Sequence, residues 1–210
     1  TLLPKTPLPE RKVLLRDPLL ALGHKGLRTT AASGLFYNYG FFTVLAFTPF
    51  ILGMDAYGIG GVFFGWGVAV AVFSVFAAPV LQNRFGAVRV LTGTLALLML
   101  DLVGLGLAAG HSVPAVVVLV VISGALLGIN NTIYTELAMG VSDSPRPVAS
   151  AGYNFVRWMG GALAPFAAAQ LGEHFGPQVP FFAGALAMVA AIAVVLGGRR
   201  FLTAHAPHVV

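Results

Sequence analysis

Amide and guanidinium side chains lie in the middle of long apolar stretches of this 210-residue chain. Asn38, Asn130 with Asn131, and Arg157 each fall roughly 14 Å from one end of a predicted helix, at a rise of about 1.5 Å per residue. Beside aromatic rings, such groups can bind an amphipathic small molecule. Alternatively, they hold helices together by hydrogen bonds. The candidate binding residues are Tyr37, Asn38, Asn130, Asn131, Tyr134, Asn154 and Arg157.

Charged residues near these stretches are candidates for gating or proton coupling. Glu136 lies close to the end of its apolar stretch, where it can form a gate or an ion pair with Arg84 or Arg146, or carry a proton. Asp101 lies in the middle of its stretch and either bonds to neighbouring helices or couples protons. An ionisable group inside a membrane is costly, so each requires an explanation.

The composition identifies lipid as the solvent. Charged residues make up only 9% of the chain, against about 25% in a soluble domain. Residues 29–54 and 56–83 contain no Asp, Glu, Lys or Arg, and about 20 apolar residues suffice to cross a bilayer. Nucleic acid is rejected as a partner because the basic residues flank the apolar stretches, as membrane topology requires. The chain has no Cys, which excludes disulfides.

Glycine and proline residues divide the chain into six predicted membrane-spanning helices. Helices satisfy their own backbone groups in lipid, whereas the alternation typical of a membrane β-barrel is absent from the sequence. We therefore expect an all-α membrane protein, with a transmembrane domain over residues 29–197 between cytoplasmic segments 1–28 and 198–210. The predicted spans are Thr29–Leu52, Ile59–Leu81, Val88–Ala109, Pro114–Met139, Val148–Leu171 and Pro180–Gly197.

The distribution of Lys and Arg predicts the orientation. All of these residues except Arg157 lie in the N-terminal segment, the second and fourth loops, or the C-terminal tail. Basic residues stay on the cytoplasmic side of a membrane. Both termini are therefore expected in the cytoplasm of a protein of the cell (inner) membrane.

Two halves of the predicted domain resemble each other. Residues 76–86, FAAPVLQNRFG, match residues 166–176, FAAAQLGEHFG, at six of eleven positions, and Ser33-Gly34 matches Ser123-Gly124 at the same offset. Three helices per unit is an odd number, so the second unit crosses the membrane in the opposite direction. Inverted repeats of this kind build many secondary transporters.

Two motifs carry a family resemblance. Residues 79–91, PVLQNRFGAVRVL, resemble the cytoplasmic loop motif of the major facilitator superfamily: Leu81, Arg84, Gly86 and Leu91 match, whereas Asn83 stands where Asp is usual. Residues 157–165, RWMGGALAP, are similar to the Gly/Pro-rich helix motif of its exporters. With GFFTVLAFTPF, FFGWG and GINNT, they make the chain resemble the C-terminal half of such a transporter, in the aromatic compound/drug exporter group.

This resemblance implies half of a twelve-helix fold, with an N-terminal six-helix half of the same polypeptide as its partner. The first and fourth spans would line a central cavity, the second and fifth would face the other half, and the third and sixth would face lipid. It implies proton-coupled efflux of small lipophilic or aromatic compounds by alternating access. Two alternatives stay open: an uptake carrier for a small metabolite, and a stand-alone six-helix protein that acts as a dimer. The first residue is Thr, and residues 1–28 are typical of a loop in a longer protein.

An intramembrane enzyme is disfavoured. A Ser–His dyad needs both side chains at one depth, but every His lies outside the predicted spans, away from Ser123. No metal-binding motif is present in the sequence. We therefore expect no catalytic residues, no metal and no cofactor.

Overall fold

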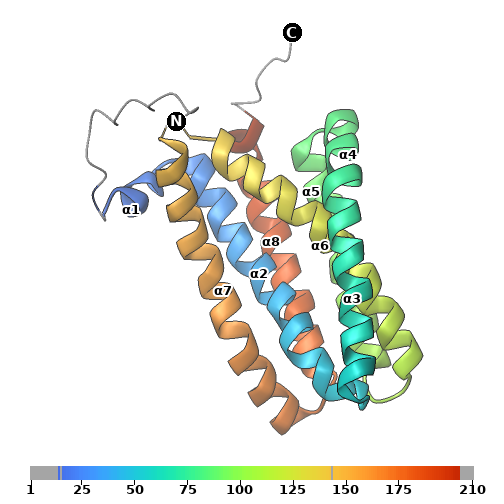
Figure 1. Ribbon diagram of the computed structural model, residues 1–210. Helices are drawn as coiled ribbons and strands as arrows, with labels where there is room; N and C mark the ends of the chain where they lie inside the picture. Colours follow the sequence, from blue (N-terminus) through green and yellow to red (C-terminus); the bar gives the residue numbers. More distant parts are fainter. Residues whose placement is uncertain (1–13, 15, 143, 204–210) are drawn as a thin grey trace, which may run out of the picture.

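The computed structural model describes residue 14, residues 16–142 and residues 144–203, and all regular elements of this part are helices (Figure 1). The rest of the predicted cytoplasmic segments 1–28 and 198–210 lies outside the described residues. The elements are α1 (Asp17–Ala21), α2 (Lys25–Leu52), α3 (Ala56–Val72), the π-helical η1 (Phe73–Ala77), α4 (Ala78–Phe85), α5 (Ala87–Ala108), α6 (Val113–Gly140), α7 (Arg146–Phe175) and α8 (Val179–Thr203).

The breaks between helices follow from glycine, as predicted, and also from side-chain caps, which were not predicted from the sequence. Glycines at the breaks adopt a positive φ, which a side chain disfavours. Asp55 caps α3, where its carboxylate accepts a hydrogen bond from the Gly58 amide at 2.8 Å. Ser112 caps α6 in the same way. The four glycines are Gly53 (φ 60°), Gly86 (φ 84°), Gly110 (φ 77°) and Gly176 (φ 100°).

Five stretches of helix are long and apolar enough to cross a membrane among the described residues: Lys25–Leu52, Ala56–Phe85, Ala87–Ala108, Val113–Gly140 and Val179–Thr203. The predicted fifth span, Val148–Leu171, lies within α7, which is not one of the five. Asn154 and Arg157 lie near the middle of α7 and lower its hydropathy.

Residues 56–85 form one continuous rod, made of α3, η1 and α4. A proline inside a helix clashes with the carbonyl four residues earlier, and Pro79 is the second residue after η1. The wider π-helical turn therefore lies where this clash would otherwise fall. Ser74 in this turn shares a 2.8 Å hydrogen bond with Thr132 of α6.

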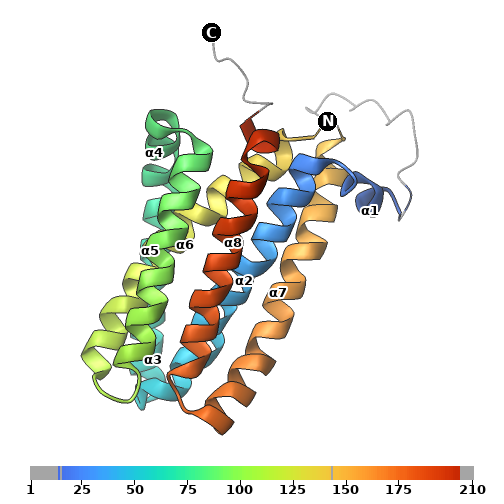
Figure 2. The same cartoon turned by 180° about the vertical axis from the view of Figure 1, so that it is seen from behind.

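Four helices form the centre of the bundle and two lie outside it (Figures 1 and 2). α2 packs against α8 and α6, and α5 packs against α8 and α6. α7 flanks α2, and the rod α3–η1–α4 flanks α6; we call these two elements the outer arms. Only 6% of the most apolar window of the Ala56–Phe85 arm is buried, against 50% in α5, so this arm leaves an apolar surface uncovered.

Both outer arms approach the centre through glycine. A Cβ atom on Gly160 of α7 would strike the backbone carbonyl of Leu35 on α2. A Cβ atom on Gly128 of α6 would strike the carbonyl of Val70 on α3. In lipid, no hydrophobic driving force brings helices together, so they associate through close packing. Small residues allow their backbones to approach closely. The arms therefore contact the centre through backbone atoms.

One end of the bundle gathers the basic residues. The start of α2, the end of α4, the start of α5, the start of α7 and the end of α8 lie at the same end in Figure 1. This end therefore carries the described basic residues of the segments that the orientation prediction uses. Those on the five helix ends are Lys25, Arg28, Arg84, Arg89, Arg146, Arg199 and Arg200.

Candidate functional site

Asn38 connects α2 to α7. Its side chain is 2% exposed, and its Nδ2 donates a hydrogen bond to the backbone carbonyl of Arg157 at 3.1 Å. Two of the predicted site residues therefore lie together at the contact between the centre and one outer arm. The sequence left two roles open for the Asn38 amide, ligand binding and hydrogen bonding between helices. In the structure, this amide forms a hydrogen bond between helices.

The guanidinium of Arg157 is held by aromatic groups. Its Nη1 donates to the Tyr153 hydroxyl at 3.2 Å, and its Cζ lies 5.3 Å from the ring centres of both Tyr153 and Trp158. Its Nε is buried without a hydrogen-bond partner, and no carboxylate of the described residues pairs with it. A cation over aromatic faces is stabilised less than one in an ion pair inside the membrane. This group therefore retains donor capacity for an anionic or aromatic ligand.

Tyr37 and Tyr134 lie inside the bundle centre and are 1% and 0% exposed. Their ring centres are 5.0 Å apart, and the Tyr37 hydroxyl donates to the carbonyl of Leu127 at 3.0 Å. Ser33 donates to the carbonyl of Ala191 at 2.9 Å, so the Tyr134 hydroxyl donates to Ser33, at 2.5 Å. This network joins α2, α6 and α8 and leaves neither tyrosine open to a ligand.

The neighbours Asn130 and Asn131 point in different directions. Asn130 is 0% exposed, and its Oδ1 accepts a hydrogen bond from Thr94 of α5 at 2.6 Å, while its Nδ2 is buried without a partner. Asn131 is exposed. Asn154 of α7 is half-buried and donates to Ser150 within its own helix at 3.2 Å. The structure therefore separates the predicted binding residues into two groups. The internal group is Tyr37, Asn38, Asn130 and Tyr134, and the open group is Asn131, Asn154 and Arg157.

Glu136 lies near the basic end of α6 and is exposed. Its Oε2 accepts a hydrogen bond from Nε2 of Gln82 on α4 at 2.5 Å, so its partner is an amide in place of the arginine that the sequence suggested. Arg84 is exposed, and its guanidinium lies 5.3 Å from the ring centre of Phe85 in the same helix. Glu136 therefore bridges the centre to the end of an outer arm.

Asp101 is the most deeply buried carboxylate among the described residues. It is 6% exposed and lies in the middle of α5. Neither carboxylate oxygen has a hydrogen-bond partner among the described residues, so the predicted bond to a neighbouring helix is not formed there. The described part of the chain contains no cluster of three or more His, Asp or Glu side chains. These carboxylates therefore offer no metal site there.

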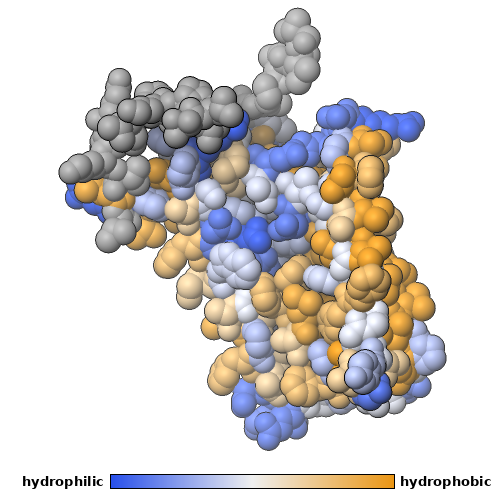
Figure 3. Space-filling model, in the orientation of Figure 1, coloured by the Kyte–Doolittle hydropathy of each residue, from blue (hydrophilic) through white to orange (hydrophobic). Residues whose placement is uncertain are grey.

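One side of the bundle carries a polar surface. Figure 3 shows a hydrophilic area over α2 and α6, beside α7, with apolar surface below it. Asn131 and Glu136 are exposed, while Asn154 and Arg157 are half-buried. Trp158, which is 49% exposed, adds an aromatic surface beside Arg157. This combination can bind a molecule that has both an aromatic part and a polar part.

Hydroxyl and amide partners were missing from the predicted site. Thr94 and Gln82 complete the contacts of Asn130 and Glu136, and Ser33 completes that of Tyr134. A hydroxyl in an apolar helix is a weak signal because it commonly bonds to its own backbone, as Thr30 does with Gly26 at 3.0 Å. Only the helix packing reveals which hydroxyl reaches across.

The chain is similar to a multidrug efflux protein of Bacillus subtilis (strain 168), YfmO. The two are 41% identical over 201 residues, which are 96% of this chain and 50% of YfmO. The chain thus spans about half the length of the curated relative it matches. No family model matches the chain, and no solved structure matches it. The apolar helices and this relative together identify a multi-pass membrane protein.

Proposed function

We propose that the chain is the C-terminal six-helix half of a major facilitator superfamily transporter, which exports small lipophilic or aromatic compounds by alternating access. The observation that carries this proposal is the 41% identity with YfmO, which is named as a multidrug efflux protein. The loop motif at residues 79–91 supports the superfamily. The greater length of YfmO supports a second half of the same polypeptide as the partner, which the loop motif would place on the N-terminal side.

α7 is the sixth crossing in this proposal. Its 30 residues extend about 45 Å, which exceeds the roughly 30 Å core of a bilayer. It packs along α2 and also contacts α8. Its polar middle is tolerated because the face with Arg157 and Asn154 would meet the cavity and the other half of the transporter instead of lipid.

Two inverted three-helix repeats account for the packing. The repeat pairs α2 with α6, the α3 arm with α7, and α5 with α8. Under this pairing, the contacts of α2 with α7 and α8 correspond to the contacts of α6 with α3 and α5, and both sets are present. The matched segments 76–86 and 166–176 each end a helix at a glycine with positive φ, at opposite ends of the bundle in Figure 1. These correspondences support the repeat proposed from the sequence.

Substrate would bind at the open face between the two halves. Arg157, Asn131 and Asn154 would contact it, beside Trp158. The internal residues Tyr37, Asn38, Asn130 and Tyr134 would hold the helices in position behind this face. Glu136 and Asp101 would carry the coupling protons, with Arg84 at the gate on the basic end. An N-terminal half that covers the exposed α3 arm would close the cavity.

The basic end would face the cytoplasm, with both termini inside and the protein in the inner membrane. Because the sequence contains no Cys, single Cys residues at Asp55 or His111 can report the outer side without background. Labelling of either site only from the cytosol would contradict this orientation. A carrier, rather than an enzyme, is also supported by Ser123, whose hydroxyl donates to the Val120 carbonyl in its own helix at 2.7 Å.

The test is transport by the full-length protein in inverted membrane vesicles. We expect a panel of lipophilic aromatic dyes to accumulate when a proton gradient is present, and accumulation to stop when a protonophore collapses it. Movement in the opposite direction would favour the uptake carrier. Absence of transport for every compound, with correctly inserted protein, would contradict the proposal. An upstream gene sequence without six further spans would favour the stand-alone dimer.

A further inference from the structure

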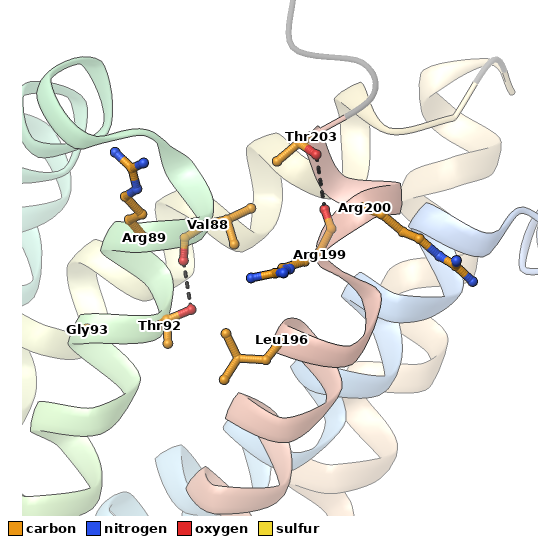
Figure 4. A pocket seen from close by; sticks show the side chains of 8 residues that line it. All are labelled: Val88, Arg89, Thr92, Gly93, Leu196, Arg199, Arg200 and Thr203. Atoms are coloured by element: carbon orange, nitrogen blue, oxygen red, sulfur yellow. Dashed lines mark hydrogen bonds between the residues drawn. The ribbon is translucent and has the colours of Figure 1, made fainter.

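A groove of about 620 Å³ lies between α5 and α8 at the basic end of the bundle (Figure 4). The functional site described above does not include it. It lies on the face of the bundle where α5 and α8 run side by side in Figure 2. The lining residues are Val88, Arg89, Thr92, Gly93, Leu196, Arg199, Arg200 and Thr203.

The groove exists because α5 and α8 are in close contact further along and separate here. Near the other end, a Cβ on Gly106 of α5 would lie 2.6 Å from the ring of Phe182. About one turn closer to the groove, a Cβ on Gly184 of α8 would lie 3.4 Å from Leu102. In the groove, by contrast, a Cβ on Gly93 would meet no atom within 4 Å. The space at this end is therefore open to a ligand.

The upper part of the groove is cationic. Arg89 and Arg199 are exposed, and no carboxylate of the described residues pairs with either. Figure 4 shows the Arg199 guanidinium reaching from α8 toward α5, while Arg200 turns away, with its Cζ 4.6 Å from the ring centre of Phe201. The first turn of α5 has no side-chain cap, so its amides add positive potential. An anionic group, above all a phosphate, can therefore bind in this upper part of the groove.

The lower part of the groove is apolar. Leu196 is 47% exposed and points from α8 toward α5 beneath the arginines (Figure 4). Thr92 and Gly93 lie on the opposite side, one turn below Val88 (Figure 4). The hydroxyl of Thr92 already donates to the Val88 carbonyl at 2.8 Å, and so adds no free donor. A ligand that fills both the upper and the lower part carries an anionic head and a hydrocarbon tail. A free phosphate would leave the lower part empty.

We infer that this groove binds an anionic phospholipid of the inner leaflet, with the phosphate between Arg89 and Arg199 and an acyl chain along Leu196. The inference rests on one part of the proposed function, namely that this end faces the cytoplasm and that α5 and α8 face lipid. Basic pockets between membrane helices on the cytoplasmic side are suited to such head groups. The partner half would cover the opposite face, around α3 and α7, and leave the groove open.

Lipid retention by the full-length protein tests this inference. The protein is reconstituted in vesicles of equal parts phosphatidylglycerol and phosphatidylethanolamine, extracted in mild detergent, and its retained lipid is counted by native mass spectrometry. We expect the wild type to retain phosphatidylglycerol selectively. The double variant Arg89→Gln/Arg199→Gln should bind it about 30-fold more weakly, since each basic residue near the surface contributes about 1 kcal/mol.

Three further variants distinguish binding in the groove from a general effect of charge. Gly93→Leu keeps every charge but fills the groove, and should also lose phosphatidylglycerol. Gly197→Leu adds the same side chain on α8 outside the groove, where a Cβ meets nothing within 4 Å, and Arg146→Gln removes a charge at the same end; both should retain it.

Three results would overturn the inference: equal retention of both lipids, unchanged retention in Gly93→Leu, or displacement of the lipid by inorganic phosphate alone. Because the assay counts lipid and not transport, a protein that retains phosphatidylglycerol but exports nothing would refute only the proposed function.

Discussion

The two outer arms contact the bundle in the same way but carry different chemistry. α7 meets α2 at Gly160, and the rod α3–η1–α4 meets α6 at Gly128, each glycine against a backbone carbonyl. The α7 contact adds the Asn38 amide, and α7 itself carries the Arg157 guanidinium, whereas the other arm adds the Ser74–Thr132 hydroxyl pair and, at its basic end, the Gln82–Glu136 hydrogen bond. One mode of backbone packing thus supports one polar arm and one apolar arm. In the proposed transporter, α7 would therefore carry the cationic part of the ligand site.

Arg157→Ala should have the largest effect if that assignment is right. We expect it to abolish efflux by the full-length protein in vesicles while membrane insertion is retained, because it removes the cation of the open face. Ser74→Ala is the matched change on the other arm and should retain most transport. Full efflux activity in Arg157→Ala would refute a central role for this residue.

Gly160→Ala and Gly128→Ala test whether the arms are held alike. Each adds a Cβ against a backbone carbonyl that cannot rotate away, and overpacking costs about 1–3 kcal/mol. We expect similar losses of thermal stability, measured by fluorescence-detected size exclusion after heating. Gly197→Ala, where the added atom meets nothing within 4 Å, is the control. A loss in only one of the two variants would show that the arms are held differently.

Glu136→Gln should slow transport several-fold without removing substrate binding. Glutamine keeps an oxygen that can accept from Gln82, so only the charge is lost. Glu136→Ala removes the charge and the hydrogen bond together, and the two variants separate these contributions. Turnover measured across a range of pH is the readout. Turnover equal to wild type throughout would discard both the gating role and the proton role.

Asn38→Ala should have the smallest effect. It removes one hydrogen bond to α7, and such contacts between membrane helices average about 0.6 kcal/mol. Thr132→Val on the other arm should cost a similar amount. Both are measured by unfolding in increasing concentrations of denaturing detergent. Unchanged stability together with lost substrate binding would instead make Asn38 a ligand-contacting residue.

The sequence predicts where helices end better than which way their side chains face. Gly53 and Gly176 break the chain for a local reason, so their positions were predictable. The opposite directions of Asn130 and Asn131 depend on which helices lie on either side of α6, and no local pattern contains that information. The groove at Gly93 depends on how far two distant helices separate, which likewise required the structure.

The backbone contacts of the outer arms have a consequence for change over evolutionary time. Where a glycine meets a carbonyl, attachment depends on a few fixed positions and not on the residues around them. Side chains on the remaining surface of α7, such as Phe155 and Met159, can then be replaced without loosening the helix. In the proposed transporter, the scaffold would therefore permit new ligand preferences to arise by single substitutions.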